Sequence, residues 1–105
     1  MKRLRGYIFK SDRSLAEMFI ELNAHGPWEW TERDNEQWGD YLATRGLMDS
    51  IAKLFKDDDH YGINLKFDSD NEGAEAQFDT VLDTLLTRVL PSIGALNVCP
   101  DEPYF

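Results

Sequence analysis

The chain has 105 residues, 42% of them hydrophobic and 12% aromatic, with a formal net charge of −9 and one cysteine. A chain of this size and apolar content folds as one domain without disulfides or a structural metal, and its negative charge disfavours nucleic acid and membrane surfaces as partners. Since Cys99 cannot form an internal disulfide and no segment approaches the roughly 20 apolar residues of a membrane span, we expect a single cytoplasmic domain over residues 1–105, with 100–105 as an extended tail.

Apolar periodicity predicts the first two elements. Residues 4–10 alternate between large side chains on both faces, which predicts a strand inside a sheet rather than at its edge. Ser14 stands three residues before Glu17, the spacing of a helix capping box, and four apolar residues follow at helical spacing: Leu15, Met18, Phe19 and Leu22. The sequence therefore predicts a helix from Leu15 to about His25, with Gly26 as the residue that ends it.

All three tryptophans lie between Gly26 and Gly46, among several acidic residues. We predict a β-hairpin here with its turn at residues 35–36, which pairs Trp30 with Tyr41 across the two strands. In this register one face is aromatic and packs into the core: Trp28, Trp30 and Tyr41. The other face points outward and provides a candidate contact surface: Arg33, Trp38 and Asp40. A longer turn would change the pairing.

Residues 47–56 fit both a helix and a strand. We favour the strand because the polar run 57–62 has the composition of a hairpin loop. The alternation of Ile63, Leu65 and Phe67 with polar residues predicts the second strand of that hairpin.

The last third of the chain predicts one long helix. Ser69 and Glu72 have the spacing of another capping box, apolar residues follow at helical spacing, and Pro91 is expected to end the helix before a short final strand around Leu96. Together, these elements predict an α+β fold: a two-layer sandwich with two helices packed on one face of an antiparallel sheet of four or five strands.

A calcium site is the sharpest candidate for a metal centre. The segment 68–79 resembles a calcium loop of the EF-hand kind, with oxygen-bearing side chains at the ligand spacing: Asp68, Asp70, Glu72 and Asp79. A strand precedes this loop where an EF-hand has a helix, and a solvated helix N-terminus accounts for the same acids. We therefore expect no metal and no cofactor, and these four residues remain the alternative.

Groupings typical of enzymes are sparse. The sequence has no Gly-rich phosphate loop and no nucleophile elbow, and Cys99 has no basic neighbour in the sequence that would activate its thiol. This pattern favours a non-enzymatic protein.

Charge is distributed unevenly. Residues 57–79 contain eight acids and one base, whereas five of the eleven Lys and Arg residues lie within the first thirteen positions. Acids beside exposed aromatic residues suit a protein that binds a basic partner, so the preferred function is an inhibitor or immunity-type protein that masks a basic target. The candidate contact residues are Arg33, Trp38, Asp40, Asp57, Asp58, Asp59 and His60.

Two alternatives stay open beside this function. One is a small enzyme or a ligand- or metal-binding domain with its site near the 57–62 loop. The other is a homodimer formed through the face of the sheet that the helices leave open.

Overall fold

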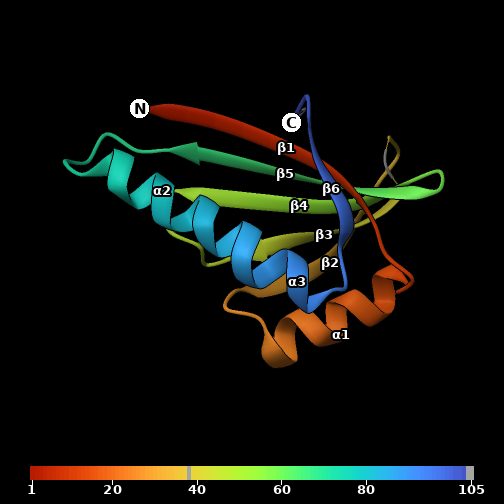
Figure 1. The fold of residues 1–105 in the computed structure, drawn as a ribbon. Coiled ribbons are helices and arrows are strands. Elements are labelled where there is room, and N and C mark those ends of the chain that lie inside the picture. The colour runs from red at the N-terminus through yellow and green to blue at the C-terminus, as the bar shows by residue number, and fades with distance from the viewer. Residues whose placement is uncertain (38, 104–105) are drawn as a thin grey trace.

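The computed structural model describes residues 1–37 and 39–103, which form one antiparallel sheet with helices packed on one face (Figure 1). The elements in chain order are β1 (Lys2–Lys10), α1 (Leu15–His25), β2 (Glu29–Asn35), β3 (Gly39–Arg45), β4 (Ser50–Asp57), β5 (His60–Asp68), α2 (Ala74–Thr84), η1 (Leu85–Val89), α3 (Leu90–Ser92) and β6 (Leu96–Asp101). The strand order is β2-β3-β4-β5-β1-β6, so β1 lies inside the sheet as predicted. The α+β class is confirmed. The sheet has six strands instead of four or five, because both 50–57 and 96–101 join it.

The core lies between the sheet and the two helical segments. Met18 and Leu22 of α1 and Phe78 of α2 are buried against the inward residues of β4 and β5, such as Leu54 and Phe67. Each fully buried side chain of this size stabilises the fold by about 1.5–3 kcal/mol. Among the described residues, no helix is long and apolar enough to cross a membrane.

Helix α1 has the predicted bounds and the predicted start. The Ser14 hydroxyl accepts a hydrogen bond from the amide of Glu17 at 3.1 Å, and the Glu17 carboxylate accepts one from the amide of Ser14 at 3.0 Å. Gly26 ends the helix in an extended conformation, with φ −79° and ψ 163°. Glycine is needed there for space, because a Cβ atom would lie 2.5 Å from the carbonyl oxygen of Leu22.

The capping box predicted for the second helix is wrong. Helix α2 begins at Ala74 after Gly73, which takes φ 77° and carries no side-chain cap, and Ser69 accepts the amide of Asn71 in the preceding turn instead. The helical segment also continues past Pro91 to Ser92. In η1 the chain widens into a π-helix, in which the amide of Leu90 bonds to the carbonyl of Leu85. This wider turn accommodates the proline, which has no N–H to donate.

The predicted register of the Trp hairpin is also wrong. Trp30 lies opposite Thr44, not Tyr41, and Arg33 lies opposite Tyr41. Asn35 pairs with Gly39, which takes φ 69°, so three residues separate the last paired positions instead of the predicted two. Because the register moves by an odd number of residues, Tyr41 changes face. Trp30 is buried under the helices as predicted, Trp38 lies outside the described residues, and Tyr41 joins a small cluster on the opposite face: Tyr41, Ala43 and Phe55.

The β4–β5 hairpin confirms a strand within residues 47–56, although it begins at Ser50, and the predicted loop at 57–62 is wrong in extent because β5 begins at His60. The hairpin closes with Asp57 paired to His60. On the face away from the helices, the Phe55 ring covers Gly62 so closely that a Cβ atom there would lie 2.5 Å from the ring. The chain after β6 crosses the same face near Gly6, where a Cβ atom would lie 3.0 Å from the backbone nitrogen of Pro103. Part of the open sheet face is therefore covered, and residues 100–101 belong to β6 rather than to a tail.

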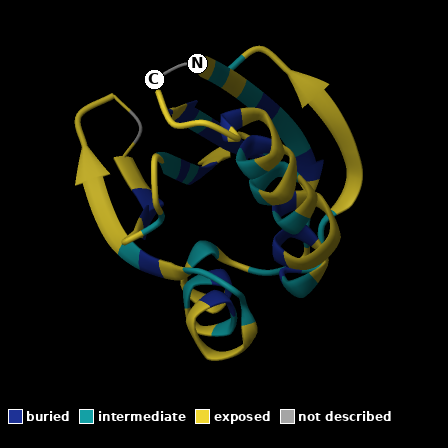
Figure 2. Cartoon of the chain, turned by 90° about the vertical axis from the view of Figure 1, so that its left-hand side faces the viewer, coloured by how far each residue is buried: buried dark blue, intermediate teal, exposed yellow. Residues whose placement is uncertain are grey.

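The two outermost strands differ in regularity. Figure 2 shows β2 on the left and β6 on the right, both exposed along most of their length. Strand β6 contains Pro100 and a left-handed residue, Asn97 at φ 55°, and its register against β1 shifts. Strand β2 pairs with β3 through seven consecutive residue pairs, from Glu29–Arg45 to Asn35–Gly39. Only β2 therefore presents an uninterrupted edge.

Candidate functional site

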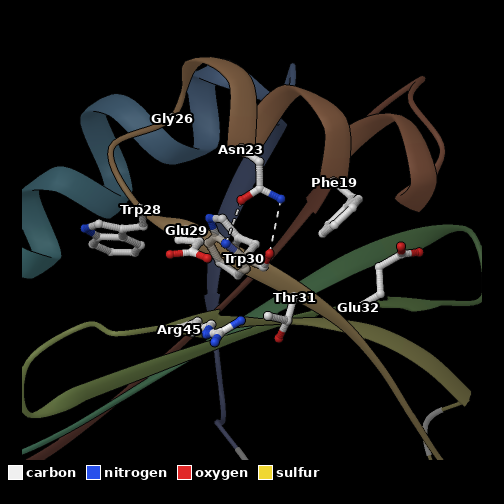
Figure 3. A pocket seen from close by; sticks show the side chains of 9 residues that line it. All are labelled: Phe19, Asn23, Gly26, Trp28, Glu29, Trp30, Thr31, Glu32 and Arg45. Atoms are coloured by element: carbon white, nitrogen blue, oxygen red, sulfur yellow. Dashed lines mark hydrogen bonds between the residues drawn. The ribbon is translucent and has the colours of Figure 1, made fainter.

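A groove of about 780 Å³ runs along the outer edge of β2, beside α1 (Figure 3). Its wall on the helix side consists of Phe19 and Asn23, residues 28–32 form the strand side, and Arg45 of β3 lies below. The groove is shallow and open to solvent. It combines half-buried aromatic rings with the carboxylates of Glu29 and Glu32.

Asn23 binds the backbone of the edge strand. Its Oδ1 atom accepts the amide of Trp30 at 2.7 Å, and its Nδ2 atom donates to the carbonyl oxygen of Trp30 at 3.1 Å. A residue of a neighbouring antiparallel strand would make the same two bonds. The Asn23 side chain therefore takes the place of one residue of a further strand.

The sequence did not indicate this contact. Asn23 occupies a polar position of the amphipathic helix, and such a position carries no sign of a specific partner. Its partner is set by the way α1 lies along β2, which no local pattern encodes.

Trp28 and Trp30 anchor the start of the groove. Their ring centroids lie 6.3 Å apart with the planes at 38°. Trp30 is only 2% exposed, and its buried indole Nε1 has no hydrogen-bond partner within residues 1–37 and 39–103. Trp28 is half-buried and leaves part of its ring at the surface. Both therefore serve as packing residues first, as the sequence predicted.

The predicted contact residues gather at one end of the sheet. The turn of the β2–β3 hairpin and that of the β4–β5 hairpin both lie there, because Tyr41 and Phe55 pair next to both turns (Figure 1). The exposed residues at this end include most of the predicted set: Arg33, Asp40, Asp57, Asp58 and Asp59, with His60 half-buried. Arg33 and Asp40 line one small depression of about 180 Å³ beside Tyr41.

His60 lies between two carboxylates of its own turn. Its Nδ1 is 3.4 Å from Asp59 Oδ1, and its Nε2 is 3.8 Å from Asp57 Oδ2. The hydrogen bond with His60 lowers the pKa of the Asp59 carboxyl below its usual value, with smaller contributions from the backbone and from Lys10. Both contacts lie within the turn, and the residues Asp57, Asp58 and Asp59 are exposed.

Strand β5 separates two groups of acids that are close in the sequence. Asp57 to Asp59 lie at one end of the strand, and Asp68 and Asp70 lie at the other. At that far end the amino group of Met1 is 3.7 Å from Asp70, and Lys2 pairs with Asp68 across the strands. The basic N-terminus thus lies beside the acids at 68–70, whereas Lys10 is a basic neighbour of Asp59 in the second hairpin turn.

The alternative calcium set does not come together. No group of three or more His, Cys, Asp or Glu side chains in the described part of the chain is arranged to hold a metal ion, and this includes Asp68, Asp70, Glu72 and Asp79. The segment 68–72 connects a strand to α2, as the sequence indicated.

Comparison with known proteins gives no assignment: neither the protein-family models nor the curated sequences contain a match to this chain.

Proposed function

We propose that this protein is a non-enzymatic interaction domain that masks a basic surface of another protein, in the manner of an inhibitor or immunity protein. One observation carries the proposal: the two neighbouring hairpin turns collect exposed acids at one end of the sheet. They are Asp34, Glu36, Asp40, Asp57, Asp58 and Asp59. Like charges held together on a rigid sheet attract a basic surface and speed its association.

The rigid scaffold supports this interpretation. Both turns close antiparallel hairpins whose strands are paired up to the last residue, Asn35 with Gly39 and Asp57 with His60. Acids fixed in this way lose little conformational freedom on binding, which leaves more of the electrostatic attraction available as affinity.

The test compares two variants of equal net charge. One neutralises the hairpin acids (Asp57→Asn, Asp58→Asn, Asp59→Asn), and the other neutralises exposed acids near the start of α2 (Glu72→Gln, Glu75→Gln, Asp79→Asn). Partners are captured from the native host by the immobilised protein at low ionic strength and eluted with salt. We expect the captured basic protein to be lost with the first variant and retained with the second.

Two results would count against the proposal. If both variants capture the basic protein equally poorly, binding depends on net charge alone and not on the hairpin acids. If the unchanged protein captures no basic protein at low ionic strength, it has no basic partner.

A further inference from the structure

We propose that the outer edge of β2 binds an extended segment rich in lysine or arginine from another protein, which joins the sheet as an additional strand. The inference rests on the proposed function and names its contact surface and its mode of binding. Strand addition uses main-chain hydrogen bonds for affinity and alternate side chains for specificity.

The edge has unused backbone groups at known positions. In an antiparallel strand, every second residue points its amide and carbonyl away from the paired neighbour. The bonds from Asn23 show that Trp30 is one such residue, so Glu32 and Asp34 are the next two. Neither has a backbone partner on that side within residues 1–37 and 39–103. The free edge therefore begins where Asn23 ends its contact and continues to the hairpin turn.

Strand β6, at the opposite edge of the sheet, is protected from strand addition. Pro100 lacks an amide donor, and the left-handed Asn97 interrupts β6, which are common ways to prevent strand addition. Strand β2 has no proline, no residue of positive φ and no break in its pairing with β3. It is the regular edge of the sheet and offers a template for a further strand.

The acidic residues along β2 favour a basic segment as the added strand. Residues 29–40 contain five acids and one base, Arg33. Two copies of this strand would bring their acids opposite one another, which disfavours self-association, whereas a basic strand would find a carboxylate at alternate positions. Phe19 lines the groove together with Glu32 (Figure 3). A lysine or arginine opposite Glu32 can therefore pack its aliphatic stem on the Phe19 ring and reach the carboxylate.

The experiment uses a short synthetic peptide of alternating lysine and threonine residues, titrated at low ionic strength into the isotope-labelled full chain. Binding is followed by amide NMR. We expect the amides of Glu32 and Asp34 to shift and to become protected from hydrogen exchange. The control peptide carries a methyl group on every backbone nitrogen, so it has the same charge but cannot donate to the strand. We expect it to bind about tenfold more weakly or worse, since at least two strand hydrogen bonds are lost.

A pair of variants tests the edge from the side of the protein. Asp34→Pro removes the outward amide without removing a bond to β3, whereas Asp34→Asn removes the same charge and keeps the amide. We expect the proline variant to lose peptide binding by about tenfold or more and the asparagine variant by only about two- to threefold. If the proline variant fails to fold, the comparison of the two peptides on the unchanged protein still tests whether binding depends on hydrogen bonds to the strand.

The possible results separate the inference from the function on which it rests. Equal binding of both peptides, or shifts confined to Asp57–Asp59, would overturn strand addition and leave a basic partner in place. Absence of any shift with either peptide would remove both the edge site and the attraction to basic chains. Concentration-dependent shifts of the β2 amides without peptide would assign the edge to a second copy and overturn the inference.

Discussion

The contact between Asn23 and the Trp30 backbone gives the sharpest prediction of stability. Replacing Asn23 with alanine removes two hydrogen bonds, each worth about 0.5–1.5 kcal/mol net. Because Asn23 is exposed, water can reach the freed amide and carbonyl, so the lower half of the summed range applies. We expect the two bonds to contribute about 1–2 kcal/mol to the free energy of unfolding.

A matched control separates these bonds from helix propensity. His25→Ala changes an exposed residue at the end of α1 that makes no such hydrogen bond within residues 1–37 and 39–103, and Asn and His have similar propensities in helices. Both variants therefore gain a similar few tenths of a kcal/mol from alanine, and the difference between them reports the hydrogen bonds.

Urea unfolding followed by tryptophan fluorescence measures that difference. We expect Asn23→Ala to be about 1–2 kcal/mol less stable than His25→Ala with the same denaturant dependence, and its melting temperature to fall by roughly 4–8 °C for each kcal/mol. Faster hydrogen exchange of the Trp30 amide in the Asn23 variant would locate the effect. If both variants unfold at the same urea concentration, the Asn23 side chain does not stabilise the edge of the sheet.

Three other substitutions test the remaining assignments. Trp30→Ala should cost about 3–5 kcal/mol in calorimetry, because a fully buried aromatic ring is removed; a loss below about 1 kcal/mol would contradict its place in the core. Gly62→Ala should lower the free energy of unfolding by about 1–3 kcal/mol, because the new Cβ atom would clash with the Phe55 ring. In a double-mutant cycle, the same change should destabilise the Phe55→Leu variant less than the unchanged protein. The hydrogen bonds from the Ser14 backbone and side chain lower the pKa of the Glu17 carboxyl, so its stabilising effect is present above the usual carboxyl pKa and is lost as the pH falls through the lowered value. In Ser14→Ala the Glu17 pKa, followed by carboxyl NMR, should rise, and an unchanged pKa would mean that the hydroxyl does not stabilise the Glu17 carboxylate.

The proposed site was predictable only in part. Composition and charge indicated a basic partner, and the residues of the two hairpin turns were named from the sequence. The groove was missed. It depends on α1 lying beside β2, and the residue that shows where the free edge begins, Asn23, resembles any solvated helix position in the sequence.

The sequence by itself determined the local elements of this protein. Periodicity and the Ser14 capping box set the bounds of α1, alternation identified β1 and β5, and the polar run at 57–62 gave the second hairpin. These signals are local because they depend on the side chains of one turn or one strand face.

The tertiary structure alone decided register, helix ends and the grouping of charges. Asn35 pairs with Gly39, which leaves one residue more between the strands than the predicted hairpin loop, and the resulting shift moves Tyr41 to the opposite face from Trp30. Helix packing carries η1 and α3 past Pro91, although an isolated helix would end there. The acids of the two hairpin turns gather at one end of the sheet because β3 pairs with β4, which places Tyr41 opposite Phe55. Each of these outcomes depends on contacts between residues far apart in the chain, which pattern and composition do not encode.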